Sequence, residues 1–185
     1  MKQESRRVRM TRKLLNDSLL ECLQHKLPDK VTVTEICRRA DVNRTTYYNY
    51  YSDPLQQYDA LMESVVGEFS DVIRKAQRSH TLSLEKLNVY VSELMELAEK
   101  HIGMIRTFNR ISGVQFWEKL SIPAIYFLQG LGSEQEEAEI ERSTFAFSGI
   151  YALLLRWISQ EKPADRSMLE QNITHMLRAL YQAAD

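Results

Sequence analysis

The sequence has few residues that shape turns or break helices, with only 6 glycines and 4 prolines among 185 residues. Such a shortage argues for long helices with short connections, and against a fold built from many strands. No apolar run approaches the roughly 18–20 residues that a membrane-spanning helix needs. We therefore expect an all-α protein with no membrane partner.

Cysteine is also scarce. The 2 cysteines, Cys22 and Cys37, show neither metal-type spacing nor a disulfide framework. We expect both to lie reduced in the core, with a redox sensor as the alternative. The first ten residues are charged and no apolar stretch follows them, so we expect no secretory signal and a cytoplasmic location.

The sequence lacks the residue patterns that enzymes commonly use for catalysis. None of the 4 histidines has a second histidine four positions away, or a neighbouring cluster of Cys or Asp, so neither a metal site nor a catalytic triad is indicated. The chain has no glycine-rich phosphate loop, and the acidic residues of 134–141 fit the solvated start of a helix. We expect no enzyme, no catalytic residue, no metal and no cofactor.

Charge is distributed unevenly along the chain. Residues 1–52 hold 11 Lys and Arg against 6 Asp and Glu, whereas residues 53–185 hold 13 against 19. A basic head on an acidic body suggests that the head approaches a polyanion, although solvated charges can also cluster by chance.

The head is predicted to hold three helices. The first should begin at Thr11 as its N-cap and run to about His25 or Lys26, because its leucines recur at spacings of three and four. The second should run from Thr32 to Ala40, and Glu35 completes a capping box with Thr32.

A short turn follows the second helix. Residues 41–43 break the helical pattern, and Asn43 can cap a third helix from Arg44 to about Tyr51. Two helices of about eight residues joined by such a turn form a helix-turn-helix. Tyr47 and Tyr51 would face the core.

Six further helices are predicted in the rest of the chain, which makes about nine in total. A long helix starts at Pro54 and connects the head to the body. The expected ranges are 53–77, 83–100, 102–111, 114–129, 133–160 and 165–183. We divide the chain into a head domain, residues 1–52, and a body domain, residues 53–185.

The third helix carries side chains that suit DNA. Arg44 can pair with guanine O6 and N7, and Asn49 can bond an adenine edge. The other outward side chains offer hydroxyls for phosphates or a methyl for thymine: Thr45, Thr46, Tyr48 and Tyr50. A packed helical hairpin with an aromatic face is the alternative.

Residues 9–61 resemble the DNA-binding domain of the TetR family. The likeness lies in the segments Arg9–Arg12, Val31–Ala40 and Asp41–Tyr51. It implies a sequence-specific regulator that binds double-stranded operator DNA. By the resemblance, the DNA contacts are Arg6, Arg7, Arg9, Thr11, Thr34, Arg44, Thr45, Thr46, Tyr48, Asn49 and Tyr50.

The chain departs from the family pattern at two positions. Asp41 stands where the family usually has a turn glycine, and Asp tolerates the left-handed conformation better than most residues. Pro54 stands where the family often has a lysine that contacts phosphate. Its absence should weaken DNA binding and lower the salt dependence by about one unit.

For the body, the resemblance implies a ligand-binding and dimerisation domain. Its last two helices carry enough apolar surface for a homodimer interface, or for an ordinary monomer core. The interface candidates are Phe147, Ile150, Leu154, Trp157, Ile173, Met176, Leu177 and Leu180. The ligand candidates, which would equally suit a plain core, are Tyr90, Met104, Phe108, Trp117, Tyr126 and Phe127.

The leading hypothesis is a repressor that an unknown small-molecule effector releases from its operator. The alternative is a TetR-like co-regulator that acts mainly by binding another protein or a ligand, with DNA binding weak or lost.

Overall fold

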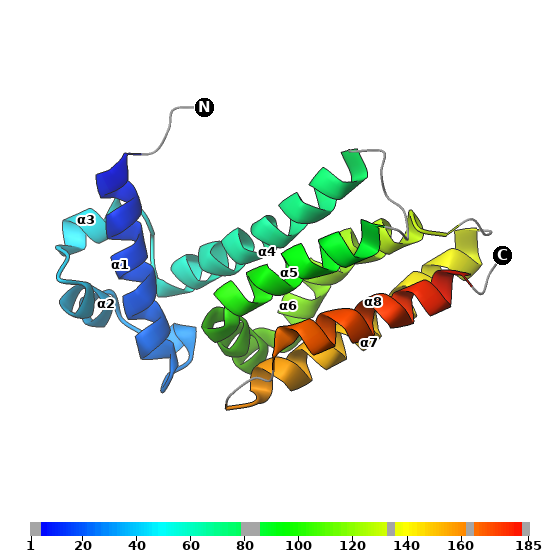
Figure 1. Ribbon diagram of the computed structural model, residues 1–185. Helices are drawn as coiled ribbons and strands as arrows, with labels where there is room; N and C mark the ends of the chain where they lie inside the picture. Colours follow the sequence, from blue (N-terminus) through cyan, green and yellow to red (C-terminus); the bar gives the residue numbers. More distant parts are fainter. Residues whose placement is uncertain (1–4, 79–85, 133–135, 162–164, 183–185) are drawn as a thin grey trace. The chain divides into compact units, whose positions relative to one another are not determined.

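The computed structural model describes residues 5–78, 86–132, 136–161 and 165–182 (Figure 1). Within these ranges the chain forms helices and no strand, so the predicted all-α fold is confirmed. In chain order the elements are α1 (Arg6–Leu23), the 3₁₀ helix η1 (Pro28–Lys30), α2 (Val33–Ala40), α3 (Arg44–Tyr48), α4 (Pro54–Arg78), α5 (Leu87–Lys100), α6 (Ile102–Gln129), α7 (Glu136–Ser159) and α8 (Arg166–Gln182).

Two compact units make up the chain. They are Met1–Ser64 and Val65–Asp185, called unit 1 and unit 2 below. The division falls inside α4, the helix that the sequence predicts to connect the head with the body.

The first helix begins earlier than predicted, because its cap is Ser5 and not Thr11. The Ser5 hydroxyl oxygen accepts a hydrogen bond from the backbone N–H of Val8 at 3.4 Å. Thr11 lies inside the helix, where its hydroxyl donates to the carbonyl oxygen of Arg7 at 3.0 Å. A hydroxyl bonded to the preceding turn is compatible with helix, so Thr11 does not start one. The inner face is buried at Leu15, Leu19, Cys22 and Leu23, whereas Leu14 is 41% exposed.

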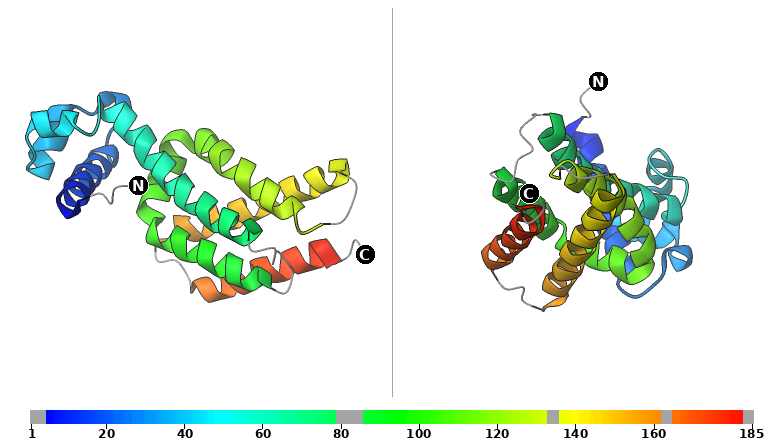
Figure 2. Two further views of the ribbon diagram at one scale, coloured as in Figure 1. Left: turned by 90° about the horizontal axis from the view of Figure 1, so that it is seen from above. Right: turned by 90° about the vertical axis from the view of Figure 1, so that its right-hand side faces the viewer.

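Unit 2 consists of the later part of α4 together with α5 to α8. Helix α5 packs beside α8, and α6 packs beside α7 (Figure 2). The apolar stripes of these helices face one another, which removes them from water and stabilises the unit. Its most deeply buried side chains include Leu87, Ile105, Phe108, Phe116 and Ile158.

A kink interrupts α6 where the sequence predicts a break between two helices. Ser112 has φ −146° and ψ 50°, which is not helical, yet the helix resumes directly after it. The described residues therefore form eight α-helices, and the expectation of about nine is corrected by this join. The Oδ1 atom of Asn109 lies 3.1 Å from the place where a Cβ on Gly113 would stand, so a larger residue there would displace it.

The ends of α7 and α8 are fixed by side chains. Asp165 caps α8 by accepting the backbone N–H of Ser167 at 2.9 Å. Arg106 of α6 donates to the carbonyl oxygens of Ile158 and Gln160, which satisfies groups that the end of α7 leaves unbonded. Ser83 and Ser133, the predicted caps of two helices, lie outside the described residues. Among the described helices, none is long and apolar enough to cross a membrane.

Candidate nucleic-acid interface and ligand cavity

The first turn of α2 is fixed by the predicted capping box. The backbone N–H of Glu35 donates to Thr32 Oγ1 at 3.2 Å, and that of Thr32 donates to Glu35 Oε2 at 3.0 Å. Lys26 also donates to the Glu35 carboxylate. The hydrogen bond from Lys26, followed by those from Thr32, lowers the pKa of Glu35 to about 2. The start of α2 thus keeps a negative charge, which its dipole favours.

The turn between α2 and α3 depends on a left-handed residue. Asp41 has φ 51° and ψ 47°, which is the left-handed conformation that we expect Asp to tolerate at this position. Val42 donates its backbone N–H to the carbonyl oxygen of Cys37 at 3.0 Å, which closes the end of α2. Asn43 then caps α3 as predicted, by accepting the N–H of Thr45 at 2.9 Å.

The inner side of α3 is anchored by two tyrosines. Tyr47 and Tyr51 are buried, as predicted, with their ring centroids 5.9 Å apart. Burial raises the pKa of the Tyr47 hydroxyl. The helix is shorter than its predicted span to Tyr51, because Asn49 and Tyr50 form tighter bonds to carbonyls three residues back. The tyrosines fix the rotation of α3, which determines what its outer side presents.

That outer side meets solvent. Arg44, Thr45, Tyr48 and Asn49 are exposed, and Thr46 and Tyr50 are partly covered. The surface of Tyr48 is 52% accessible, which is a large fraction for a tyrosine adjacent to the buried Tyr47. A hydrogen bond between Arg44 and Tyr48 raises the pKa of the guanidinium. These side chains can reach a ligand without any change in the core.

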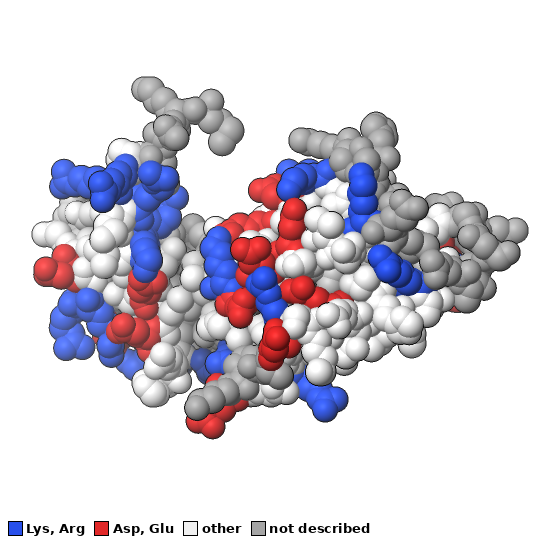
Figure 3. Space-filling model, in the orientation of Figure 1, with Lys and Arg blue, Asp and Glu red and all other residues white. Residues whose placement is uncertain are grey.

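The start of α1 adds positive charge. The predicted contacts Arg6, Arg7 and Arg9 are all exposed, as is Thr34 on the first turn of α2. Figure 3 shows Lys and Arg side chains gathered at the end of unit 1 where α1 begins. The sequence prediction missed Arg12, whose guanidinium lies 5.9 Å from the centroid of the Tyr50 ring. Its position in the arginine-rich first helix was the available signal.

Unit 2 contains a cavity of about 120 Å³. All five of its helices contribute to the wall, and the wall is almost wholly apolar. The lining residues are Phe69, Ile73, Leu87, Tyr90, Val91, Leu94, Met95, Ala98, Leu120, Ala124, Phe127, Leu128, Phe147, Ile150, Tyr151, Leu154, Ile173 and Leu177.

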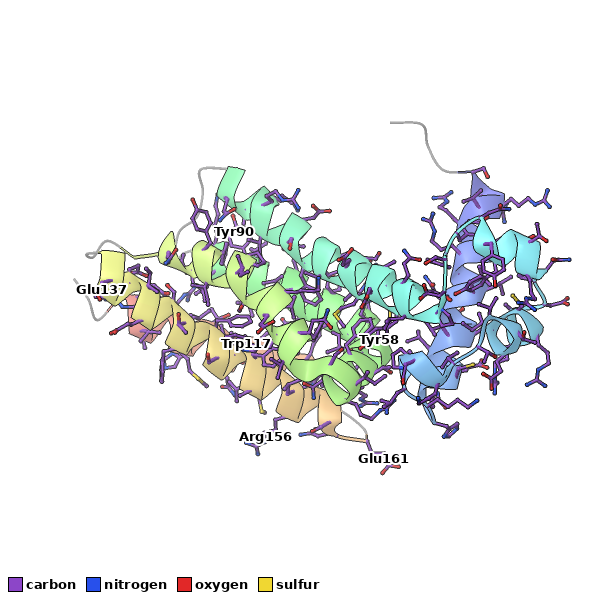
Figure 4. The ribbon with its side chains drawn as sticks, turned by 180° about the vertical axis from the view of Figure 1, so that it is seen from behind. Tyr58, Tyr90, Trp117, Glu137, Arg156 and Glu161 are labelled. Carbon is purple, nitrogen blue, oxygen red and sulfur yellow. The ribbon has the colours of Figure 1, made fainter. Side chains whose placement is uncertain are left out.

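Two of the six predicted ligand residues line this cavity. Tyr90 and Phe127 do so together, in an edge-to-face contact with ring centroids 5.9 Å apart. Phe108 packs on Phe116 in the core instead. Tyr126 is 70% exposed. Met104 and Trp117 are partly covered and do not belong to the lining (Figure 4 labels Tyr90 and Trp117).

The two tyrosines of the cavity wall do not make it polar. The hydroxyl of Tyr151 donates to Asn109 Oδ1 at 3.4 Å, next to the kink in α6. Burial raises the pKa of Tyr151, so its phenol stays neutral. Asn109 thus accepts the one proton that the Tyr151 hydroxyl can donate.

Part of the predicted dimer surface is covered within a single chain. Phe147, Trp157, Ile173 and Leu177 are buried, and five of the eight candidates line the cavity: Phe147, Ile150, Leu154, Ile173 and Leu177. Met176 is exposed, while Ile150, Leu154 and Leu180 are partly covered. The outward faces of α7 and α8 carry other apolar side chains, with Phe145 at 73% exposure and Met168 at 69%.

No group of three or more His, Cys, Asp and Glu side chains suited to a metal ion occurs in the described part of the chain. Cys22 and Cys37 are free and buried there, and burial raises the pKa of both thiols.

Taken together, α2, the turn and α3 form a helix-turn-helix, in which a short helix is anchored from behind and presents polar side chains outward. That module defines a class of nucleic-acid-binding proteins. No family model matches the chain.

Solved structures place the whole chain in a known fold. The dihydroxyacetone kinase operon activator DhaS is 15% identical, with a TM-score of 0.65 over 95% of this chain and 98% of that one. A TetR transcriptional regulator from Streptococcus agalactiae 2603V is 19% identical, with a TM-score of 0.63 over 93% and 96%. The TetR family repressor AlkX from Dietzia sp. strain DQ12-45-1b, implicated in biodegradation of n-alkanes, is 17% identical, with a TM-score of 0.55 over 94% and 96%. The chain has the fold of TetR-family transcriptional regulators, as predicted from residues 9–61.

A sequence relative agrees with this fold. The chain is 25% identical, over 114 residues, to YxbF of Bacillus subtilis (strain 168), described as an uncharacterized HTH-type transcriptional regulator. The match covers 61% of this chain and 30% of that protein, so the chain corresponds to less than a third of its relative. The structural neighbour from Streptococcus agalactiae and this relative are both described as transcriptional regulators.

Proposed function

We propose that this chain is a sequence-specific transcriptional regulator that binds operator DNA as a homodimer and acts as a repressor in the cytoplasm. Residues 1–52 would be its DNA-binding domain and residues 53–185 its ligand-binding and dimerisation domain. The observation that carries the proposal is the outer side of α3, where Arg44 and Asn49 are exposed on a helix that Tyr47 anchors from behind. The TetR fold and the HTH-type relative support it.

DNA reading is assigned to α3. A helix of this kind places the side chains of its first turns against base edges in the major groove. Arg44 would pair with a guanine and Asn49 with an adenine, while the hydroxyls of Thr34 and Tyr48 bond phosphates. The arginines at the start of α1 would neutralise phosphates without reading sequence.

Dimerisation is assigned to the outward faces of α7 and α8. Phe145 and Met168 are exposed apolar side chains that a partner copy would cover. Beside Phe145, residues 148, 149 and 152 of α7 are small and exposed, which permits close approach of another helix. Two copies are needed because an operator offers its half-sites on adjacent turns of the duplex.

Effector binding is assigned to the cavity of unit 2. A molecule that fills it contacts all five helices of the unit, including α4. Because α4 also belongs to unit 1, a change in its position would move the DNA-binding helices. A ligand would release the operator if it bound more tightly to a conformation in which the two DNA-binding domains no longer match the half-sites.

The alternative is a co-regulator that binds another protein and holds DNA weakly. The absence of the lysine usual at Pro54 favours this alternative, because one phosphate contact is lost. The exposed Arg44 and Asn49 oppose it, since a head that no longer reads bases has no need of them.

The test is a selection from random duplexes, followed by titration of the enriched sequence at two salt concentrations. The wild-type chain should select a palindrome. Arg44→Ala should weaken binding to it by at least roughly thirtyfold, since the dimer loses two bidentate base contacts of about 1–3 kcal/mol each. Arg74→Ala removes the same charge from an exposed ion pair with Asp71 in unit 2, and should bind as the wild type does. Weak, unselective binding that Arg44→Ala leaves unchanged would favour the co-regulator.

Gly149 tests the dimer separately. A Cβ at Gly149 would have no atom within 4 Å in the single chain, so Gly149→Leu fits the fold of one copy. Across a helix interface the added side chain would separate the partners, and sedimentation should show a loss of dimer. Gly103→Leu on α6 enters equally open space and should leave the dimer intact. Unchanged dimerisation in Gly149→Leu would remove α7 from the interface.

A further inference from the structure

The cavity of unit 2 limits which molecules can occupy it. Its lining residues are aliphatic or aromatic, from Phe69 on α4 to Leu177 on α8, apart from the hydroxyls of Tyr90 and Tyr151. A water molecule against such walls finds few polar partners, so the walls favour an apolar occupant over bound solvent.

Charged groups flank the cavity but bond to one another. At one end, Glu68 accepts from Lys100 at 2.6 Å and lies 3.1 Å from His101 Nε2, one helical turn beyond the lining residue Ala98. None of these three side chains belongs to the wall. A ligand anion or cation at this end would find its counter-charge already paired.

At the opposite end the charged side chains are Glu139 and Arg142, whose Oε2 and Nη1 atoms form an ion pair at 3.4 Å. The hydroxyl of Ser143 bonds Glu139 at 3.2 Å and Tyr181 at 3.0 Å, and Arg142 lies over the Tyr181 ring. Ser143 and Tyr181 each stand one turn beyond a lining residue of their helix. Since burying an ionised group without a partner costs several kcal/mol, neither end of the cavity favours a charged ligand.

The volume sets the size of the occupant. A dry apolar cavity of about 150 Å³ is known to hold benzene, and the present cavity measures about 120 Å³. From wall chemistry, paired ends and volume, we propose that the effector is a small, uncharged, apolar molecule of about six non-hydrogen atoms. This inference rests on the effector-controlled regulator proposed above and names the chemical class of its effector.

Benzene is a suitable probe, and benzoate is its charged counterpart. Benzene should shift the methyl resonances of Ile73, Ile150 and Ile173 in the full chain. It should also raise the melting temperature by about 4 °C at roughly ten times its Kd. Benzoate should do neither. Methyl resonances unmoved by benzene, or moved as strongly by benzoate, would overturn the assigned class.

Substitutions in the wall localise the binding. Ala124→Phe places a ring inside the cavity and should abolish the benzene response, whereas Val114→Phe adds the same ring at an exposed position of α6 and should not. Leu94→Ala enlarges the cavity, and should bind butylbenzene about tenfold more tightly than the wild type does. It tests the site even if Ala124→Phe does not fold. Unchanged benzene affinity in Ala124→Phe, or unchanged butylbenzene affinity in Leu94→Ala, would overturn the site.

Operator titration separates this inference from the proposed function. If the proposed function and the proposed ligand class are both right, benzene weakens operator binding by the wild-type chain but not by Ala124→Phe. A chain that binds benzene but selects no DNA would overturn the regulator and leave the ligand class standing. A chain that selects an operator but does not bind benzene would overturn the ligand class and leave the regulator standing.

Discussion

Asn16 on α1 accepts a hydrogen bond from the hydroxyl of Tyr51 at 3.0 Å, which ties the first helix to the segment that follows α3. The same Oδ1 atom also accepts the side-chain amide of Gln57 on α4 at 3.1 Å. Tyr51 is almost buried and Gln57 is completely buried, so both donors depend on partners within the protein. One amide oxygen therefore joins three elements of unit 1.

Removing this acceptor should destabilise unit 1. Asn16→Ala leaves the Tyr51 hydroxyl and the Gln57 amide without it, and should lower the free energy of unfolding by about 2 kcal/mol. Urea denaturation measures the loss. Asn172→Ala makes the same change at an exposed position of α8 and should have little effect. Equal stability of the two variants would show that the shared hydrogen bonds contribute nothing.

The left-handed turn residue gives a second prediction. Asp41→Val should lower the free energy of unfolding by about 1–2 kcal/mol, because a β-branched side chain is strained at φ 51°. Asp41→Gly and Asp41→Asn should keep the stability of the wild type, since both residues accept this conformation. Thermal unfolding distinguishes the three variants. A valine that is tolerated as well as glycine would mean that the turn changes conformation.

The Glu35 carboxylate gives a prediction about pH. Its pKa is about 2 in the folded chain and near its ordinary value of 4.5 in the unfolded chain. Its contribution to stability is therefore fully present above pH 4.5 and is lost as the pH falls toward 2. A carboxyl-carbon NMR titration should place its midpoint in that low range.

Lys26 provides the control for this titration. Lys26→Met removes the principal cause of the shift and should raise the pKa of Glu35 toward 4.5. Lys13→Met breaks a different lysine–carboxylate pair, with Asp17, and should leave the Glu35 titration unchanged. A Glu35 midpoint that Lys26→Met does not move would contradict the assigned cause.

The arginines of α1 give a prediction about salt. Arg6→Gln, Arg7→Gln and Arg9→Gln should each lower the slope of log affinity against log salt by about two, one for each copy in the dimer, with little effect on which sequence is selected. Fluorescence titration at several salt concentrations measures the slope. Arg74→Gln in unit 2 should leave it unchanged. Slopes identical to the wild type in all three α1 variants would place this face away from DNA.

Local sequence signals predicted the helix-turn-helix in detail. The Thr32–Glu35 capping box, the Asn43 cap and the left-handed Asp41 all occur as expected. Each depends on residues at most three positions apart, so their pattern is legible in the chain. Thr11 was the exception, because Ser5 offers a competing cap earlier in the sequence and the helix extends to use it.

Features made by distant residues were not predictable in this way. Asn16 meets Tyr51 and Gln57 across more than thirty positions of sequence, and nothing near it indicates those partners. Arg106 on α6 donates a hydrogen bond to the end of α7, and no residue near Arg106 in the sequence indicates this partner. Of the ligand candidates, only Tyr90 and Phe127 line the cavity, because apolar residues in the middle helices suit a core and a cavity wall equally.

The sequence by itself determined the capping box of α2, the cap of α3 and the polar outer side of α3, because helical periodicity and capping are decided by neighbours along the chain. Tertiary structure alone decided which apolar faces meet. It buries Phe147 and Leu177 in the wall of a cavity and leaves Phe145 exposed, although the three are equally apolar. The hydrophobic effect has no direction, so the partner of an apolar side chain is fixed only when the helices have packed.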